Sequence, residues 1–567
     1  MNDIVLELDK LSIALPPGAD RALAVTGIDL VLRAGEVTCL IGESGSGKSL
    51  VARSILGLLP GPQVRVSSGR ILFEGMDLAR ATPAQMRAVR GARIAMIFQE
   101  PMTALNPLHT IGRQIDEVLR IHTKLAATAR RARVIDLLES VHLPEPAQLL
   151  RSFPHQLSGG QRQRAMIAMA LALRPRLLIA DEPTTALDVT TQAQILRLIR
   201  DLQHQHGTAV LFITHDFGVV ADIADTVAVL QKGVLVEQGA TAQVLTRPAH
   251  PYTRALIAAV PKLMPPPLRA PNKAPFVIQA RDVCKTYGAR GFFGGRSTLA
   301  LDTVSIELRR GETLGLVGES GSGKSTLARA ITRLLNVDSG EILFSGRDIA
   351  RMNNLQLRPY RKRIQIVFQD PYGSLDPRQR VLDIIAEGPI IHGTEPGKAR
   401  DEARALLALV GLDPSAAGRF AHEFSGGQRQ RIGIARALAL QPEVLVADEP
   451  VSALDVSVQA QVLALLADVK ARLHLSMLFV THDLRVALQV CDRIAVMQRG
   501  QVVEIAPTAE IYGAPKHPYT KALFAALPGA NWQEAAYACL QQPHLLRDHA
   551  PMSPVPQAAD WRDLILR

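Results

Sequence analysis

One octapeptide, Gly-Glu-Ser-Gly-Ser-Gly-Lys-Ser, occurs twice in this chain of 567 residues, at 42–49 and at 318–325. Each copy matches the pattern G-x-x-x-x-G-K-[ST], follows a short apolar run and precedes a segment compatible with a helix. In this order of strand, loop and helix, the glycines let successive backbone N–H groups point at phosphate oxygens, and the helix adds the positive end of its dipole. The duplication therefore predicts two α/β units, each with a phosphate-binding loop.

The last two residues of each octapeptide are expected to have distinct roles. The ammonium groups of Lys48 and Lys324 would reach the β- and γ-phosphates of a nucleotide, and the hydroxyls of Ser49 and Ser325 would ligate magnesium. The predicted phosphate-binding residues are Gly42, Glu43, Ser44, Gly45, Ser46, Gly47, Lys48 and Ser49 in the first loop and Gly318, Glu319, Ser320, Gly321, Ser322, Gly323, Lys324 and Ser325 in the second.

Composition narrows the class of protein. A hydrophobic content of 47% is enough to build the cores of about four domains at roughly 150 residues each. The sequence begins without a basic segment followed by a long apolar run, and no stretch reaches about 18 uninterrupted apolar residues, so we expect neither a secretory signal nor a membrane span. A net charge of +11 is compatible with a nucleic-acid partner or with the anionic face of a membrane, and charge alone does not choose between them.

Several other landmarks of the first half recur in the second half. The motifs that keep a constant offset of 267 residues are Ser-Gly-Gly-Gln, Asp-Glu-Pro, Thr-His-Asp and His-Pro-Tyr-Thr. Two copies of one module of roughly 250 residues explain this offset. Between them, six prolines in fifteen residues are typical of an extended, semi-rigid linker or of a rigid loop packed on one module. The expected divisions are a first module (1–260), a linker (261–275), a second module (276–528) and a C-terminal tail without an assigned role (529–567).

Short, continuous apolar runs precede the acidic and histidine motifs. Residues 177–180 and 444–447 are typical of central strands buried on both faces of a parallel sheet, and each run ends at an Asp-Glu pair. Residues 209–213 and 477–480 are similar runs that end at Thr-His. Ligands of such sheets bind beyond the carboxyl ends of the strands, so the phosphate loop, the acidic pair and the histidine are expected to converge there.

The Ser-Gly-Gly-Gln motif narrows the kind of nucleotide-binding protein. A serine is a good N-cap, and two glycines let backbone N–H groups approach an anion at the start of the following helix. Residues 157–164 and 424–431, each followed by an aliphatic helix and the Asp-Glu-Pro strand, resemble the signature of the ATP-binding cassette family. The resemblance covers about residues 4–528. It implies two tandem P-loop (RecA-like) α/β cassettes, each with a helical signature subdomain and an antiparallel β subdomain.

This resemblance also implies roles for the remaining motif residues. The two cassettes would pair within the chain, and ATP would lie between the phosphate loop of one and the signature of the other. The aspartates would hold Mg²⁺, the glutamines would sense the γ-phosphate, the glutamates would polarise the attacking water and the histidines would orient the γ-phosphate. Both sites are then expected to hydrolyse ATP. The residues concerned are Asp181, Asp448, Ser49, Ser325, Gln99 and Gln369 for the metal, Glu182, Glu449, His215, His482, Gln99 and Gln369 for catalysis, and Ser158, Gly159, Gly160, Gln161, Ser425, Gly426, Gly427 and Gln428 for nucleotide binding.

One position distinguishes the two halves. Tyr287 lies 31 residues before the second phosphate loop, where the family places an aromatic ring that stacks on adenine. The matching residue of the first half is Leu15, and residues 1–72 contain no aromatic Phe, Tyr or Trp at all. We therefore expect ATP to bind about two- to tenfold more weakly at the site of Lys48, because a stacking contact contributes roughly 0.5–1.5 kcal/mol.

What the ATPase drives is inferred from a finer resemblance. Residues 98–107 and 368–378 look like the glutamine loops of the bacterial oligopeptide, dipeptide and nickel importer ATPases. So do the His-Pro-Tyr-Thr motifs, at 250–253 and 517–520, which we interpret as structural turns and family markers and not as ligand sites. Most members of that group are separate subunits, whereas two cassettes are fused here, and residues 95–102 with 105–110 are especially similar to the fused ATPases of peptide and microcin C importers. The competing alternatives are the fused glutathione importer ATPases and an ATPase of the same kind for nickel uptake.

A soluble ATPase that acts on the ribosome or on DNA is the alternative of a different class. Such proteins normally carry helical arms, zinc modules or coiled coils, and this chain has a short proline-rich connector instead. The importer interpretation implies two transmembrane permease subunits as partners, indirectly a periplasmic or surface substrate-binding protein, and no nucleic acid. It also implies a peripheral position on the cytoplasmic face of the bacterial inner membrane.

The cysteines are expected to have no ligand-binding role. Cys39, Cys284, Cys491 and Cys539 lie far apart without a C-x-x-C pair, so neither a zinc site nor a disulfide framework is expected. Related single-cassette subunits often carry a cysteine cluster after the cassette, proposed to bind iron and sulfur. This sequence lacks such a cluster, so we predict no iron–sulfur cluster.

Overall fold

The computed structural model consists of two compact units. The first runs to Val260 and includes Ala526–Gly529 and Trp532, and the second runs from Pro261 to Ala525. Part of the expected linker (265–271) and nearly all of the expected tail, Cys539 included, lie outside the described residues. The structure describes residues 3–19, 21–184, 187–264, 272–288, 297–452, 454–529 and 532.

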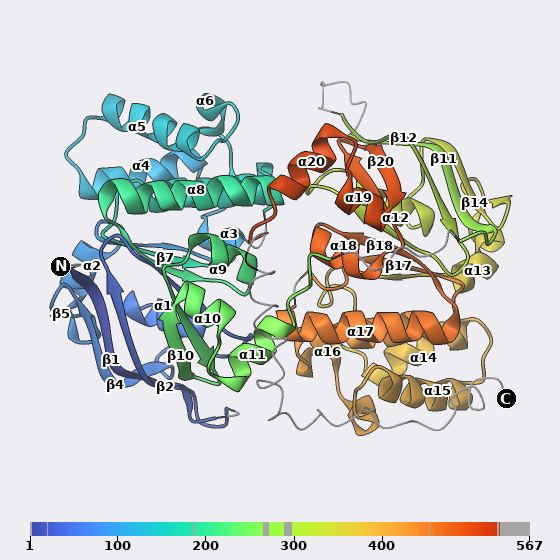
Figure 1. Cartoon of the computed structure of the whole chain (residues 1–567), viewed down its shortest axis with the longest axis horizontal. Coiled ribbons are helices and arrows are strands. Elements are labelled where there is room, and N and C mark those ends of the chain that lie inside the picture. Colours follow the sequence, from blue (N-terminus) through green and yellow to red (C-terminus); the bar gives the residue numbers. More distant parts are fainter. Residues whose placement is uncertain are drawn as a thin grey trace. The chain divides into compact units, whose positions relative to one another are not determined.

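Two β-sheets form the first unit (Figure 1). An antiparallel sheet has the strand order β2-β1-β4-β5. A second sheet has the order β10-β9-β3-β8-β7-β6 and is parallel from β9 to β6, with β10 antiparallel to β9. The strands are β1 (Ile4–Ala14), β2 (Leu23–Arg33), β3 (Val37–Ile41), β4 (Arg65–Phe73), β5 (Met76–Asp77), β6 (Ile94–Ile97), β7 (Leu177–Asp181), β8 (Ala209–Ile213), β9 (Thr226–Gln231) and β10 (Val234–Ala240).

Helices α4, α5 and α7 of this unit pack on one another and form a helical subdomain between β6 and β7. Two short 3₁₀ helices, η1 (Leu78–Arg80) and η2 (Pro154–Gln156), interrupt the loops. The helices are α1 (Lys48–Ile55), α2 (Pro83–Val89), α3 (Pro101–Ala104), α4 (Ile111–His122), α5 (Ala127–Ser140), α6 (Pro146–Leu149), α7 (Gly159–Ala170), α8 (Val189–His206), α9 (Phe217–Ile223), α10 (Thr241–Thr246) and α11 (Pro251–Ala258).

The second unit repeats this topology strand for strand. Its antiparallel sheet has the order β12-β11-β14-β15, and its larger sheet has the order β16-β17-β18-β13-β19-β20. The expectation of two tandem α/β cassettes, each with an antiparallel subdomain, is thereby confirmed. The strands are β11 (Phe276–Tyr287), β12 (Thr298–Arg309), β13 (Thr313–Val317), β14 (Ser339–Phe344), β15 (Arg347–Asp348), β16 (Ile364–Val367), β17 (Val444–Asp448), β18 (Ser476–Thr481), β19 (Arg493–Gln498) and β20 (Gln501–Pro507).

The helical subdomain recurs as well, because α14, α15 and α16 pack on one another. The 3₁₀ helices of this unit are η3 (Pro414–Gly418) and η4 (Ala421–Glu423). The helices are α12 (Lys324–Ile331), α13 (Asn354–Arg363), α14 (Val381–Ile391), α15 (Pro396–Leu409), α16 (Gly426–Leu438), α17 (Val456–Leu473), α18 (Leu484–Val490), α19 (Thr508–Gly513) and α20 (Pro518–Ala525).

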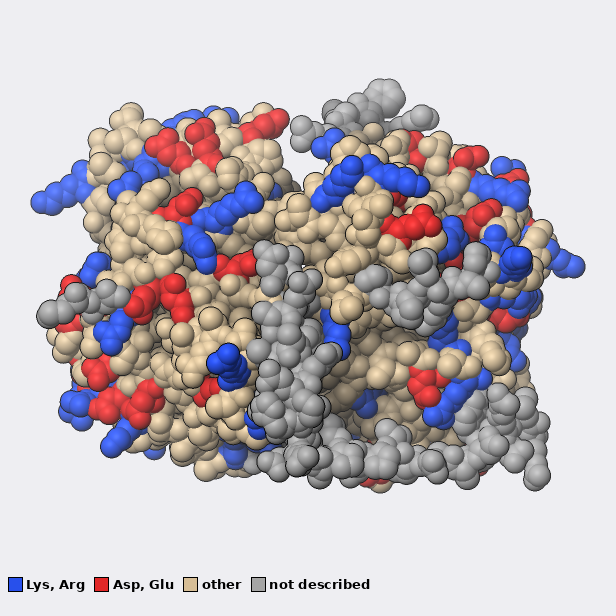
Figure 2. Space-filling view, viewed as in Figure 1, with Lys and Arg blue, Asp and Glu red and all other residues tan. Residues whose placement is uncertain are grey.

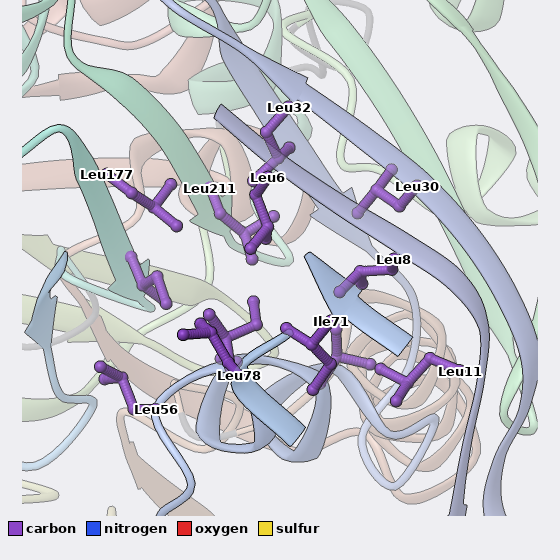
Figure 3. Packing of buried hydrophobic residues seen from close by; sticks show 14 of the residues in the cluster. Leu6, Leu8, Leu11, Leu30, Leu32, Leu56, Ile71, Leu78, Leu177 and Leu211 are labelled. Atoms are coloured by element: carbon purple, nitrogen blue, oxygen red, sulfur yellow. The ribbon is translucent and has the colours of Figure 1, made fainter. Parts of the chain in front are cut away.

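The expected central strands are confirmed, and their burial explains their sequences. Every residue of β3, β7 and β8 is buried, as is every residue of β13, β17 and β18. Strands covered on both faces have no polar side, so their sequences are continuous apolar runs. Figure 3 shows Leu6 of β1 beside Leu211 of β8, and Leu177 of β7 belongs to the same cluster, so the two sheets of the first unit share one core. Burial of each such side chain contributes about 1.5–3 kcal/mol.

Two surface properties bear on function. Within the residues that the structure describes, no helix combines the length and the apolar character needed to cross a membrane. On the face seen in Figure 2, the described Lys and Arg side chains are interspersed with Asp and Glu over each unit. The net positive charge is therefore not gathered into one basic patch among the described residues of that face.

Candidate functional site

Each phosphate loop joins a buried strand to a helix and turns where only glycine fits. Gly42 has φ 148°, and a Cβ atom there would lie 2.1 Å from the carbonyl oxygen of Leu230. Gly318 has φ 151°, and its Cβ would lie 2.2 Å from the carbonyl oxygen of Met497. Residues with a side chain rarely adopt this backbone conformation, and a Cβ atom would not fit in this space. Both loops therefore require glycine for the turn that leads into α1 and α12.

The lysine at the start of each helix is held inside its loop. Lys48 Nζ donates hydrogen bonds to the carbonyl oxygens of Gly42, at 2.7 Å, and Glu43, at 2.9 Å. Lys324 Nζ makes the same two bonds in the second unit, at 2.7 and 2.8 Å. Both side chains are buried. A buried ammonium at the N-terminus of a helix is suited to binding phosphate.

A serine and an aspartate form the next part of each site. Ser49 Oγ donates to Asp181 Oδ1 at 3.0 Å, and Ser325 Oγ donates to Asp448 Oδ1 at 2.9 Å. Both aspartates end a buried strand, and burial raises the pKa of each carboxyl although the serine bond opposes this change. Hydroxyl and carboxylate oxygens are ligands that magnesium prefers, and a cation beside these carboxyls would favour their charged form. The residues present therefore fit a magnesium ion.

The glutamate after each aspartate contacts both the glutamine and the histidine of its unit. In the first unit Gln99 Nε2 donates to Glu182 Oε2 at 2.9 Å, and His215 Nδ1 lies 3.3 Å from Glu182 Oε1. These three side chains come from the ends of β6, β7 and β8. The parallel order of the strands thus gathers residues that are far apart in the sequence at one edge of the sheet.

The same contacts recur in the second unit, where they shift two pKa values. Gln369 Nε2 donates to Glu449 Oε2 at 2.8 Å, and His482 Nδ1 lies 3.2 Å from the same oxygen. Burial opposes both charges, but the bond and charge of His482, with a smaller contribution from Lys324, hold the pKa of Glu449 below its ordinary value. The bond to Glu449 likewise outweighs burial and raises the pKa of His482. The pair is therefore stabilised as carboxylate and imidazolium.

Both glutamates have an unusual backbone conformation. Glu182 has φ 48° and Glu449 has φ 46°, in the left-handed region that few residues other than glycine adopt. Their N–H groups are bound to the carbonyl oxygens of Ile213 and Val480, each at 2.9 Å. Strain of this kind costs about 1–3 kcal/mol and persists where the surroundings hold it. The sequence contains no signal for it.

The signature motifs begin helices α7 and α16. Ser158 Oγ accepts from the backbone N–H of Gln161 at 3.3 Å, and the Gln161 side chain accepts from the Ser158 N–H at 3.0 Å. Ser425 and Gln428 form the same reciprocal cap at 3.4 and 3.0 Å. The serines are N-caps, as expected, and the two glycines of each motif form the first turn. Which phosphate loop each signature faces stays a prediction.

The strand register supports the pairing of Leu15 with Tyr287. Leu6 of β1 lies opposite Phe73, and Ile278 of β11 lies opposite Phe344, so Leu6 and Ile278 are equivalent. Leu15 and Tyr287 each follow nine residues later. Leu15 is partly buried and packs against the core of its unit, whereas Tyr287 is 41% exposed. The first unit therefore has a leucine at the position where the second unit has an exposed aromatic ring.

A further pair of residues contacts the phosphate loops and was not expected from the sequence. Tyr252 and Tyr519, in the His-Pro-Tyr-Thr motifs, accept hydrogen bonds from the backbone N–H groups of Glu43 and Glu319, each at 3.1 Å. These motifs are expected to be turns, but each begins a helix, α11 at Pro251 and α20 at Pro518. His250 caps α11 by accepting from the Tyr252 N–H. The constant offset of the motif was the one available signal for a second role.

Comparison with protein families gives two matches in each half of the chain. The family described as "ABC transporter" matches residues 25–185 and 301–452. The description "Oligopeptide/dipeptide transporter, C-terminal region" matches residues 236–290 and 503–549. The first includes the phosphate loop and signature of each unit, and the second includes both His-Pro-Tyr-Thr motifs.

Similar proteins extend over nearly the whole chain. The peptidoglycan transport ATP-binding protein YejF of Agrobacterium fabrum is 51% identical over 527 residues, which cover 92% of this chain and 96% of the relative. The glutathione import ATP-binding protein GsiA of Salmonella choleraesuis is 47% identical over 560 residues, which cover 93% of this chain and 90% of the relative. GsiA of Escherichia coli is 46% identical over the same shares.

Proposed function

This chain belongs to the ATP-binding cassette transporter family, with two cassettes fused in one polypeptide, and we propose that it powers a bacterial importer of peptides by hydrolysing ATP in both cassettes. The observation that carries the proposal is the repeated set of contacts around each phosphate loop. In each cassette a lysine, a serine–aspartate pair and a glutamate held by glutamine and histidine lie at one edge of the same sheet.

Each residue of the site would have its own role. Lys48 would hold the β- and γ-phosphates, and Asp181 with Ser49 would hold the metal. Bound Mg²⁺ would neutralise the charge that develops on the phosphate oxygens. Glu182 would accept a hydrogen bond from the attacking water and orient it, and His215 would stabilise the γ-phosphate. Lys324, Asp448, Ser325, Glu449 and His482 would do the same in the second cassette.

We infer that the two cassettes pair within the chain and share their nucleotides. The first turn of a helix has backbone N–H groups without partners inside the helix, and glycines at 159–160 and 426–427 keep those groups accessible. Each signature would bind the γ-phosphate held by the phosphate loop of the other cassette. The proposed boundaries remain 1–260 and 276–528 for the cassettes, with 261–275 as linker and 529–567 as tail.

The chain is a component of an importer complex, and we propose its partners and position from the family. Two transmembrane permease subunits would bind the cassettes near the glutamine loops, and a periplasmic or surface protein would deliver the substrate. The chain would then lie peripherally on the cytoplasmic face of the inner membrane. On the face seen in Figure 2 the described Lys and Arg side chains lie among acidic ones, whereas nucleic-acid binding normally uses a clustered basic surface.

The substrate class is proposed to be peptides. The family description of the C-terminal regions names oligopeptides and dipeptides, and the relatives are named for peptidoglycan and glutathione transport. Peptidoglycan and glutathione both contain peptide bonds, so a solute that carries a short peptide is common to these names. Glutathione itself is the second candidate, because the GsiA proteins are 46–47% identical to this chain.

The test is ATP hydrolysis by the full chain, alone and with its permease pair and binding protein in lipid vesicles. Wild type is compared with the double variant Glu182→Gln/Glu449→Gln. Activity that rises with the permeases and substrate and is absent from the double variant would support the proposal. Uptake of labelled dipeptide against labelled glutathione would choose the substrate. Activity that responds to ribosomes or DNA and ignores the permeases would overturn the importer function.

A further inference from the structure

The tyrosine hydroxyl of each His-Pro-Tyr-Thr motif meets one particular peptide group of the phosphate loop. Tyr252 Oη accepts from the backbone N–H of Glu43 at 3.1 Å, across 209 residues of sequence. Tyr519 Oη accepts from the N–H of Glu319 at 3.1 Å, across 200 residues. Two cassettes that are not identical in sequence thus make the same long-range contact at the same distance. A simple turn does not need this bond.

The same peptide group also binds the lysine of the loop. The N–H of Glu43 and the carbonyl of Gly42 belong to one planar peptide unit, and that carbonyl oxygen accepts from Lys48 Nζ at 2.7 Å. A continuous chain of hydrogen bonds therefore runs from the tyrosine hydroxyl through one rigid plane to the ammonium. A bond at the N–H end restrains rotation of the plane and so sets the direction of the carbonyl. Bonds in such chains also polarise one another.

The second cassette contains the same chain of bonds. Glu319 N–H donates to Tyr519, and the carbonyl oxygen of Gly318, in the same peptide unit, accepts from Lys324 Nζ at 2.7 Å. The lysine lies deep in the loop in both cassettes. The orientation of this peptide unit therefore fixes one of the two acceptors of each lysine, and the carbonyl oxygen of Glu43 or Glu319 is the other.

Hydrogen bonds from β10 fix the segment of the first cassette that carries Tyr252. A carboxylate on β10, Glu237, accepts from the backbone N–H groups of Ala249 at 2.7 Å and His250 at 3.0 Å. The ring of His250 then caps α11 by accepting from the Tyr252 N–H at 3.2 Å. These hydrogen bonds connect the start of α11 to β10. They restrict the movement of the segment that carries the Tyr252 hydroxyl.

An equivalent brace exists in the second cassette. Glu504 on β20 accepts from the N–H groups of Lys516 at 2.8 Å and His517 at 3.0 Å. His517 Nδ1 accepts from the Tyr519 N–H at 3.2 Å. The next residue of the motif, Thr520, is fully buried, as is Thr253 in the first cassette. In both cassettes, hydrogen bonds and burial therefore fix the segment that carries the tyrosine hydroxyl.

We propose that Tyr252 and Tyr519 are positioning residues for the phosphate-loop lysines. Each hydroxyl orients the peptide unit that holds Lys48 or Lys324, so that the ammonium is ready to receive phosphate. The proposal rests on the proposed binding of ATP at these loops. The segments after β10 and β20 would then affect the affinity of the phosphate loops for nucleotide.

The experiment uses the full chain with Tyr252→Phe, Tyr519→Phe and the double variant. Phenylalanine keeps the ring and removes only the hydroxyl. Loss of one such bond is expected to weaken ATP binding by roughly two- to tenfold at the altered site. KM for ATP should rise with kcat at saturating ATP nearly unchanged, because the lysine contacts phosphate in both ground and transition states. The thermal unfolding temperature without nucleotide should not change.

Tyr512→Phe is the matched control, because Tyr512 lies in the same C-terminal region, is 38% exposed and packs edge-on against Phe524. It should bind ATP as wild type does. Wild-type affinity in both Tyr252→Phe and Tyr519→Phe would overturn the inference. So would a loss of affinity accompanied by a lower unfolding temperature of the nucleotide-free chain, since that result indicates a structural role. Failure of the wild-type chain to bind ATP would instead overturn the proposed function.

Discussion

The two cassettes agree closely around the phosphates and differ where a base would bind. The serine–aspartate distance is 3.0 Å in the first cassette and 2.9 Å in the second, and the glutamine–glutamate distance is 2.9 Å against 2.8 Å. At the C-terminal end of β1 and β11, however, the first cassette has a partly buried Leu15 and the second an exposed Tyr287.

The phosphate loops and the predicted base position thus belong to different parts of each cassette. The phosphate contacts come from the parallel sheet and its loops, whose strands are buried on both faces and tolerate little change. The predicted base position lies at the C-terminal end of β1 and β11, in a different sheet from the one that supplies the phosphate contacts. Affinity at one site can therefore change while its catalytic contacts stay the same.

The largest expected effect tests whether the cassettes are equal in catalysis. Glu182→Gln or Glu449→Gln should lower hydrolysis at the altered site by roughly 10²- to 10⁴-fold, because an amide is a poor acceptor for the proton of water. Single-turnover hydrolysis by each variant measures this loss. Glu139→Gln, at an exposed position of α5, is the control. If either variant hydrolysed ATP like wild type, the glutamate at that site would not be catalytic and the cassettes would be unequal.

A second prediction concerns the loops themselves. Gly42→Ala and Gly318→Ala should each weaken ATP binding at the altered site by at least about tenfold, because the new Cβ would lie 2.1 or 2.2 Å from a carbonyl oxygen. Equilibrium binding of a fluorescent ATP analogue measures the loss. Gly75→Ala and Gly346→Ala are matched controls with φ 85° and 83° and open space around the added atom. Equal binding in all four variants would contradict the prediction.

Exchanging the side chains at the predicted base position is expected to have a smaller effect on ATP affinity. Leu15→Tyr should tighten ATP binding at the first site, and Tyr287→Leu should weaken it at the second, each by about two- to tenfold. GTP binding should be compared with ATP binding in the same titrations. Equal affinities at the two wild-type sites, or no change in either variant, would show that neither residue contacts the base.

The smallest expected effect depends on pH. The pKa of His482 is raised above its ordinary 6.5 and that of Glu449 is lowered below its ordinary 4.5. The histidine contribution to stability is then full below about pH 6.5 and is lost as pH rises through the raised value, whereas the glutamate contribution is lost only in acid, as pH falls through the lowered value. His482→Gln should lower the unfolding temperature of the chain by about 2 °C at pH 6 and by less at pH 9. A difference that grows with pH would contradict the ion pair.

Much of the fold and most of the candidate site could be predicted from local patterns. The apolar runs at 177–180 and 444–447 are central strands, and Ser158 and Ser425 cap helices, because burial on two faces and helix capping are set by adjacent residues. The left-handed backbone of Glu182 and Glu449 was not predictable, because neither residue type favours it and the surrounding structure imposes it.

Local patterns in the sequence are enough to predict two phosphate loops in two related α/β cassettes, since glycine spacing and apolar runs act over a few residues. The contacts of Tyr252 and Tyr519 with the phosphate loops become visible only when the chain is folded. Contacts across 209 and 200 residues depend on which strands are neighbours and where the following helix packs. That information is held by the order of the sheet and is absent from any short stretch of sequence.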